Sequence, residues 1–392
     1  MKEPSKIVRD IKPSGIRKFF DLASTVEGCI SLGVGEPDFD TPWHICDAAV
    51  QSMQQGKTHY TANRGLIELR REIARFHKEH YGQNYDPETE IIVTTAGSEA
   101  VDISFRALLD PGDEVIVLDP NYVAYEPAIR MAGGVPVYIR LKEENEFKLK
   151  PEDLKKAITN KTKAMMLNFP SNPTGGVMTK EDYAALVDII KESGIYVISD
   201  EIYAEILFDG EFASLAQFPE IKDQVIIING FSKAFAMTGW RLGYLLSSKE
   251  MSSLLNKIHQ YVMMSAPTAA QYAAIEALRN GYEDVAAMKE EYRARRNLVC
   301  SRLNRMGLKT SIPHGTFYVF ANITPTGLSS DDFAAELLKE EKVAVVPGTA
   351  FGASGEGFVR MSYATSMDNL KKAMTKIEDF IRKRGVVPAQ AE

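Results

Sequence analysis

Residues 230–244 read GFSKAFAMTGWRLGY and directly follow the apolar run 225–228. That run predicts a strand, so Lys233 stands just beyond the end of a strand, and Arg241 follows eight residues later. Burial disfavours the charged form of a lysine and leaves its amine nucleophilic, which suits a Schiff base. A nearby arginine can bind a phosphate through two hydrogen bonds. A lysine after a strand is more often simply solvated, so the interpretation depends on the rest of the chain.

Outward from this segment, short β-rich runs alternate with helical stretches. We expect helices at 98–109 and 180–192. The predicted strands are 91–94, 114–118, 135–139, 164–167, 196–199, 225–228 and 242–246. This alternation predicts an α/β fold with a largely parallel sheet.

The character of the sequence changes after residue 283. Apolar residues at helical spacing predict a long helix over 284–306. Beyond it we expect strands at 316–320, 343–346 and 358–362, and helices at 330–340 and 367–384. This pattern predicts a smaller α+β domain joined to the main one by the long helix. With the resemblance described below, the expected division is an N-terminal arm with part of a small domain (1–45), a large cofactor-binding domain (46–283), and the long helix with a smaller α+β domain (284–392).

The composition is that of an ordinary globular protein: 45% hydrophobic, 25% charged, with a net charge of −7 over 392 residues. Acidic and basic residues are interspersed along the chain, so the sequence does not indicate a nucleic-acid-binding surface. No apolar run approaches the roughly 20 residues of a membrane helix. The start lacks the apolar region of a signal peptide. Three cysteines, Cys29, Cys46 and Cys300, match neither a disulfide framework nor a metal site. A cytoplasmic protein without metal is the expectation.

Four polar clusters follow predicted strands, where ligands bind in open α/β sheets. The turn 95–98, with Ala96, Gly97 and Ser98, can present backbone N–H groups to an anion, although Ser98 could be a plain helix cap. The loop 168–176 holds two prolines and two glycines; it is either an ordinary turn or a rigid support for Asn172, which can donate to a phenolate oxygen.

The other two clusters contain charged residues. Asp200 closes an apolar strand and can pair with a pyridinium N–H, with Tyr203 near the ring oxygen; its alternative is a helix cap. Arg360 lies within a strand, where it either faces solvent or binds a substrate carboxylate.

These motifs together resemble a known family. The segments are GVGEPDFDTP (33–42), YTANRG (60–65), SNPTG (171–175), and SK (232–233) through GWR (239–241). Their order and spacing are similar to those of class I, fold-type I pyridoxal-phosphate aminotransferases, in the branch with prokaryotic aspartate and aromatic aminotransferases, over essentially the whole chain. The resemblance implies a mostly parallel seven-stranded sheet with a smaller α+β domain. It also implies a cytoplasmic homodimer that moves an amino group between an L-amino acid and a 2-oxo acid such as 2-oxoglutarate in a ping-pong cycle.

The resemblance also implies a role for individual residues. Lys233 would form the Schiff base and move the substrate proton. Asp200 would pair with the ring nitrogen. Asn172 and Tyr203 would bind the ring oxygen, and Tyr122 would pack on the ring face. The phosphate would be bound by Ala96, Gly97, Ser98, Ser232, Arg241 and Tyr60 of the neighbouring subunit. The substrate carboxylate would be bound by Gly35, Asn172 and Arg360.

Two positions depart from the family pattern. Gly230 replaces a serine that many relatives place on the phosphate, and Ser232 is a candidate substitute. Ser98 stands where some aspartate-specific relatives have a lysine, which favours a neutral or aromatic donor. Alternatives on the same scaffold are a C–S lyase acting by β-elimination and a γ-eliminating aminocyclopropane-carboxylate synthase. A regulator that carries this fold would need a DNA-binding domain ahead of it, and only about thirty residues precede residue 33.

Overall fold

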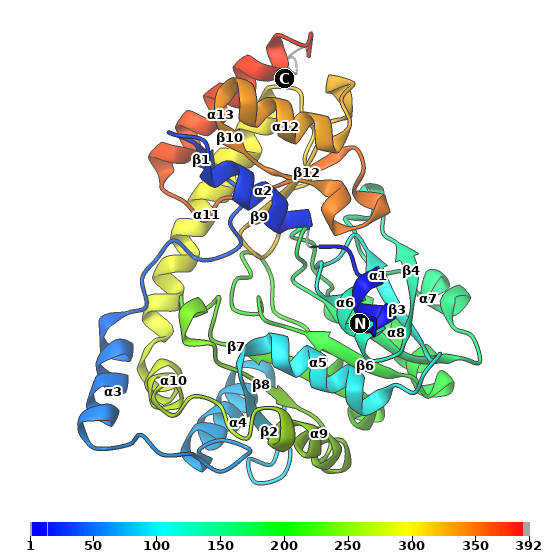
Figure 1. Cartoon of the computed structure of the whole chain (residues 1–392), viewed down its shortest axis with the longest axis vertical. Coiled ribbons are helices and arrows are strands. Elements are labelled where there is room, and N and C mark those ends of the chain that lie inside the picture. The colour runs from blue at the N-terminus through cyan, green and yellow to red at the C-terminus, as the bar shows by residue number, and fades with distance from the viewer. Residues whose placement is uncertain (1, 14, 387–392) are drawn as a thin grey trace.

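The computed structural model describes residues 2–13 and 15–386 of the chain. Figure 1 shows a large part built on a wide sheet and a smaller part above it. The long helix α11 (Tyr282–Arg305) runs from one part to the other. The C-terminal helix α13 (Met367–Arg382) lies in the smaller part, whereas the short first helix α1 (Lys6–Asp10) lies beside α6 (Tyr125–Met131) of the large part.

The large part contains a seven-stranded sheet in the order β2-β8-β7-β6-β5-β3-β4. Its strands are β2 (Ile91–Thr94), β3 (Glu114–Asp119), β4 (Val135–Arg140), β5 (Thr162–Asn168), β6 (Tyr196–Asp200), β7 (Val225–Gly230) and β8 (Gly243–Leu246). Neighbouring strands are parallel except for β8, which is antiparallel to both β7 and β2. The predicted α/β fold with a mostly parallel seven-stranded sheet is confirmed.

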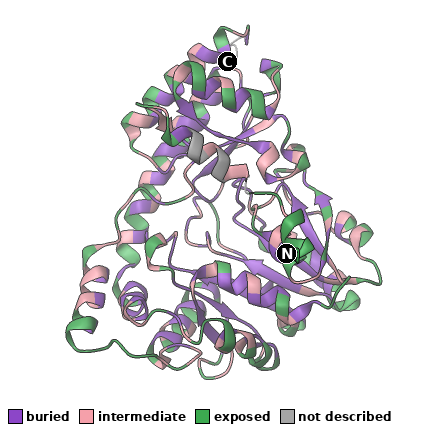
Figure 2. Cartoon of the chain, viewed as in Figure 1, coloured by how far each residue is buried: buried purple, intermediate pink, exposed green. Residues whose placement is uncertain are grey.

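Helices cover both faces of this sheet, so its strands are apolar on both sides, as Figure 2 shows. Alternate strand residues enter opposite cores: Ile116 contributes to one and Val117 to the other. One face is covered by α5 (Ala96–Leu108), α6 and α9 (Lys249–Val262). The other is covered by α3 (Trp43–Gln54), α4 (Ile67–Tyr81), α7 (Pro151–Ala157), α8 (Lys180–Ser193) and α10 (Thr268–Asn280).

The smaller part has its own core and two small sheets. An antiparallel sheet holds β11 (Val346–Pro347), β12 (Phe358–Ser362) and β9 (Tyr318–Asn322) in that order. A parallel pair joins β1 (Ile30–Ser31) to β10 (Val343–Ala344), so a segment near the N-terminus completes this part. The remaining helices here are α12 (Ser330–Glu341), α13 and α2 (Gly15–Ser24). No helix among the described residues is long and apolar enough to cross a membrane.

Several predicted boundaries differ from the structure, and three of them are instructive. The strand expected at 343–346 is two short strands in different sheets, because β10 pairs with β1 and β11 pairs with β12. The strand expected from residue 316 begins at Tyr318, since Thr316 has a φ of 66° and is not extended. The helix expected from Ser98 begins at Ala96.

Candidate active site

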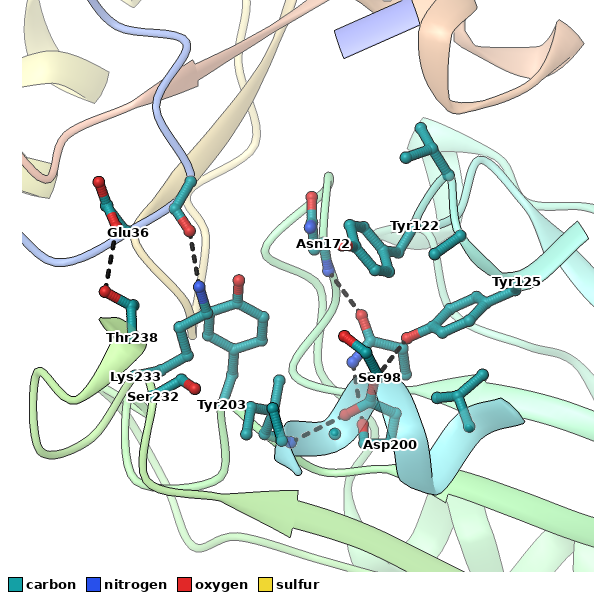
Figure 3. A pocket seen from close by; sticks show the side chains of 18 of the residues that line it. Glu36, Ser98, Tyr122, Tyr125, Asn172, Asp200, Tyr203, Ser232, Lys233 and Thr238 are labelled. Atoms are coloured by element: carbon teal, nitrogen blue, oxygen red, sulfur yellow. Dashed lines mark hydrogen bonds between the residues drawn. The ribbon is translucent and has the colours of Figure 1, made fainter. Parts of the chain in front are cut away.

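A cavity of about 830 Å³ lies at the carboxyl ends of the parallel strands, between the sheet and the smaller part. It gathers every residue that the sequence predicted for the site except Tyr60. These are Gly35, Ala96, Gly97, Ser98, Tyr122, Asn172, Asp200, Tyr203, Ser232, Lys233, Arg241 and Arg360. Figure 3 shows several of these side chains converging from separate elements.

Lys233 lies just after β7, and its amine points into the cavity. Its Nζ donates a hydrogen bond of 2.6 Å to the carbonyl oxygen of Gly35. The pKa of Lys233 is lowered to about 8, chiefly by burial; the charge of Glu36 opposes this shift, and those of Arg360 and Arg241 contribute to it. A large share of the amine is therefore neutral and nucleophilic near neutral pH.

Asp200 ends β6 on the opposite side of the cavity and is only 8% exposed. Burial raises the pKa of its carboxyl to about 6, although hydrogen bonds from the Tyr125 hydroxyl (2.8 Å) and the Ile202 backbone N–H (3.2 Å) favour the charged form. A buried carboxylate of this kind binds strongly to a cationic N–H, which supplies the missing positive charge.

Asn172 and Arg360 hold each other in a fixed orientation. The Arg360 guanidinium donates to Asn172 Oδ1 (2.9 Å) and to the Gly33 carbonyl (2.7 Å). Its plane is packed between the rings of Tyr318 and Phe351, 4.2 and 4.8 Å from their centroids. Since the oxygen of Asn172 faces Arg360, its amide nitrogen is left to donate to a ligand.

Tyr203 extends from the loop after β6, and its hydroxyl forms a 3.0 Å hydrogen bond with that of Tyr318. Tyr318 therefore contacts both Tyr203 and the guanidinium of Arg360. A Cβ on Gly35 would lie 2.8 Å from the Tyr318 hydroxyl, so only glycine lets the backbone at residue 35 approach this wall.

The turn before α5 forms the lower wall of the cavity. Ala96 has a left-handed backbone (φ 63°), which aims the first turn of the 13-residue helix into the cavity. A Cβ on Gly243 of β8 would lie 2.7 Å from backbone atoms of Ala96 and Gly97, so the turn packs there only against glycine. Free N–H groups and the helix dipole make such a terminus an anion site.

The segment between β7 and β8 completes this wall. Arg241 has a φ of 54° and donates from Nη1 to the Thr238 carbonyl (3.0 Å). Ser232 is buried and lines the cavity. At Gly230 a Cβ would lie 2.9 Å from Gly243 Cα, so a serine cannot occupy this position without moving β8.

Tyr60 was predicted to serve the site of the neighbouring subunit, and it lies outside the cavity of its own subunit. The residue is 81% exposed. Tyr122, in contrast, lines the cavity and contacts Tyr125 edge to face, with centroids 5.5 Å apart.

Two site residues were missed by sequence reasoning. Tyr125 bonds Asp200, and Tyr318 bonds Tyr203. Tyr125 lies three residues after Tyr122, a helical spacing that could have placed both on one face. For Tyr318, we find no local signal in the sequence.

The donor set fits pyridoxal phosphate. One cavity contains a lysine of lowered pKa, a buried carboxylate, an asparagine with a free amide nitrogen, and a helix N-terminus next to Arg241. Arg360 also has a buried Nε with no hydrogen bond to any described residue.

Comparisons with known proteins agree with this chemistry. The profile of the family described as aminotransferase class I and II matches residues 27–377. A putative aminotransferase of Bacillus subtilis (strain 168), YugH, is 50% identical, over 97% of this chain and 98% of that protein. An aspartate aminotransferase of Pyrococcus abyssi is 45% identical, over 95% and 97%. The crystal structure of an aromatic aminotransferase from Pyrococcus horikoshii has a TM-score of 0.90 at 43% identity, with 95% of this chain and all of that chain covered.

Proposed function

Since the chain belongs to the class I and II aminotransferases and transfers amino groups with pyridoxal phosphate, we propose which of its residues perform each part of that reaction. The observation that carries the proposal is the convergence of Lys233, Asp200, Asn172 and Arg360 on one cavity. When bound, the cofactor withdraws electrons from the substrate Cα and so acidifies its C–H bond.

Lys233 would hold the cofactor through Nζ and, once released by the substrate amine, move the proton at the substrate Cα. Its lowered pKa supports this role, because the neutral amine is the form that accepts a proton. Asp200 would keep a proton on the ring nitrogen, and its burial strengthens that pairing.

The remaining cofactor contacts follow from the walls of the cavity. Asn172 Nδ2 and the Tyr203 hydroxyl would bind the ring oxygen, and Tyr122 would pack on the ring. The phosphate would be bound by Ala96, Gly97, Ser98, Ser232 and Arg241. The helix N-terminus at Ala96 and the arginine beside it support this assignment.

Arg360 would bind the substrate α-carboxylate, together with Gly35 and Asn172. Its packing between two rings and its bonds to Asn172 and Gly33 fix the guanidinium before substrate arrives. Both the L-amino acid and the 2-oxo acid carry this carboxylate, so one arginine would serve both half-reactions of a ping-pong cycle.

We propose an aromatic or neutral L-amino acid as donor and a 2-oxo acid such as 2-oxoglutarate as acceptor. Ser98 lines the cavity without a charge, and the apolar side chains of Ile16, Val34 and Met131 line it as well. Among the similar proteins, several are named for aspartate and others for aromatic substrates, so the names leave both classes open.

We also propose a homodimer. Tyr60 lies near an exposed apolar surface at the end of α9, formed by Tyr261 (87% exposed), Val262, Met263 and Met264. An apolar surface of this kind indicates a protein interface. Across it, Tyr60 would reach the cofactor phosphate of the partner subunit.

The division of the chain into an arm (1–45), a large domain (46–283) and a small domain (284–392) is likewise a proposal, supported by the separate core of the smaller part. The free state of Cys29, Cys46 and Cys300 supports a cytoplasmic location.

The test is a single half-reaction. The cofactor-loaded enzyme, given one amino acid at a time and no acceptor, should release about one 2-oxo acid per site and no ammonia. Continuous release of ammonia would instead indicate a lyase. Lys233→Ala should still bind the cofactor but lose turnover by roughly a thousandfold or more. Full activity in Lys233→Ala would overturn the assignment.

A further inference from the structure

A buried ionisable pair lies directly behind the phosphate-binding wall. Glu99 is in the first turn of α5, and His259 is near the end of α9. His259 Nδ1 and Glu99 Oε1 are 2.5 Å apart, and the two side chains are 0% and 3% exposed. A pair buried this completely is costly to desolvate, so it calls for a role beyond stability.

Glu99 fixes the turn that begins α5. Its Oε2 accepts a 2.5 Å hydrogen bond from the backbone N–H of Thr95. Thr95 directly precedes Ala96, whose left-handed backbone aims the helix terminus into the cavity. The carboxylate therefore holds the residue on which the direction of the phosphate-binding turn depends.

His259 fixes a second element. Its Nε2 donates to the backbone carbonyl of Asn63 at 2.7 Å, and the Asn63 side chain donates to the Met264 carbonyl at 2.7 Å. Asn63 belongs to the loop 60–65, which begins with the exposed Tyr60. Both ring nitrogens of His259 are thus hydrogen-bonded, Nδ1 to Glu99 of α5 and Nε2 to Asn63 of the loop 60–65.

The charges of the pair also matter for an anion site. A carboxylate in the first turn of α5 competes with a phosphate for the helix terminus and repels it. Contact with the His259 ring gives that carboxylate a hydrogen-bonding partner inside the protein. Loss of His259 would leave the carboxylate buried and uncompensated, whereas loss of Glu99 removes the repelling group itself.

We propose that Glu99 and His259 are positioning residues that tie the phosphate-binding turn of one subunit to the loop carrying Tyr60, which serves the other subunit. The pair would thus fix the position of two elements at once: the turn that binds the phosphate in its own subunit, and the loop whose Tyr60 reaches the phosphate in the partner subunit. The inference rests on the proposed phosphate roles of the turn and of Tyr60.

The test compares two ligands of the cofactor-free enzyme: pyridoxal phosphate, and pyridoxal, which lacks the phosphate. Absorbance titration gives the affinity for each. His259→Gln should weaken pyridoxal phosphate binding about ten- to a hundredfold and leave pyridoxal unchanged, because one or two buried hydrogen bonds of a charged group are lost. Glu99→Gln should weaken it less, and Glu99→Gln/His259→Gln should regain part of the loss.

His77→Gln is the matched control, because His77 is equally buried and bonds Gln83 and Tyr244 away from the cavity. It should change neither affinity. Circular dichroism verifies that each variant is folded. Equal losses for both ligands in His259→Gln, or no loss for either, would contradict the proposal.

A double-mutant cycle with Tyr60→Phe tests the link between subunits. Tyr60→Phe should weaken only pyridoxal phosphate, and its effect should not add to that of His259→Gln. If Tyr60→Phe weakens neither ligand, the proposed role of Tyr60 is wrong. If it does weaken pyridoxal phosphate but the two effects add fully, that role stands and the inference of a link is wrong.

Discussion

Two titratable groups of the cavity, Lys233 and Asp200, carry opposite charges in their ordinary states, and burial shifts both toward neutrality. The pKa of Lys233 falls to about 8, and that of Asp200 rises to about 6. For the lysine, the lowered pKa increases the share of the neutral, nucleophilic amine near neutral pH. For the aspartate, burial makes the carboxylate unfavourable unless a positive charge lies beside it, and a cationic ring nitrogen can supply that charge.

The first prediction concerns the pH dependence of Lys233. A lysine with a lowered pKa is neutral above that pKa, so its reactivity rises through a lower pH range than that of an ordinary lysine. Trapping of the cofactor-free enzyme with pyridoxal and borohydride should be half-maximal near pH 8 at Lys233, as read by peptide mass spectrometry. A lysine in a short peptide, whose ordinary pKa is about 10.4, is the control. Identical profiles would refute the predicted shift.

The second prediction concerns Tyr125. Its hydroxyl favours the charged form of Asp200, so Tyr125→Phe should raise the pKa of Asp200 above about 6. We expect kcat to fall about five- to tenfold, the worth of one buried hydrogen bond, with little change in KM. The acid limb of the rate profile should move to higher pH. Tyr138→Phe, on the edge strand β4, is the control; an unmoved acid limb would show that Tyr125 does not act through Asp200.

Most of these residues could be predicted because each charged or polar side chain follows an apolar strand. Lys233, Asp200 and Asn172 all have such local signals. Tyr318 has none, because it reaches the site by packing against Tyr203, 115 residues away in sequence. A contact of this kind depends on how the smaller part sits on the sheet, which no local pattern encodes.

At the scale of elements, the antiparallel strand β8 is what brings Lys233 and Arg241 together. The chain leaves β7 at Gly230 and returns beside it at Gly243, and these two residues are paired. A Cβ on Gly243 would lie 2.7 Å from backbone atoms of Ala96 and Gly97, and a Cβ on Gly230 would lie 2.9 Å from Gly243 Cα. A serine at residue 230 would therefore crowd β8.

The third prediction tests this crowding. Gly230→Ser should destabilise the enzyme by about 1–3 kcal/mol, as overpacking does, and should not tighten binding of the cofactor. Chemical unfolding and cofactor titration measure the two effects. Gly239→Ser is the control in the same segment, because a Cβ there would meet no described atom within 4 Å. Tighter cofactor binding in Gly230→Ser would show instead that the serine can be accommodated.

Strands with one strong pattern were predicted well, and the two-residue strands β10 and β11 were not. β12 matches its predicted range of 358–362. The run at 343–346 is equally apolar, but its two halves pair with different strands, β1 and β12. An apolar pattern gives the tendency to form a strand, whereas the partner of each half is decided by tertiary packing.

At the scale of the whole molecule, Arg360 connects the two parts. It lies in β12 of the smaller part and bonds Asn172, which follows β5 of the large sheet, and Gly33 of the N-terminal segment. The proposed substrate site is therefore complete only when these three segments, distant in the sequence, meet.

The fourth prediction concerns the proposed dimer. Tyr261→Glu places a charge in the exposed apolar surface and should shift the enzyme toward monomers, with activity that falls on dilution. Light scattering after size exclusion measures the mass. Ile312→Glu, at another exposed apolar residue on the loop before β9, is the control. A Tyr261→Glu protein that stays dimeric would place the interface elsewhere.

The pairing of Gly230 with Gly243 also bears on how the enzyme folds. The loop between them is short, so its closure costs little chain entropy, and Lys233 and Arg241 are brought together by a local event. Arg360 and Gly33, by contrast, are 327 residues apart, and their contact must await the meeting of nearly the whole chain. During refolding, the paired strands β7 and β8 should therefore gain protection from hydrogen exchange before the contact between Arg360 and Gly33 forms.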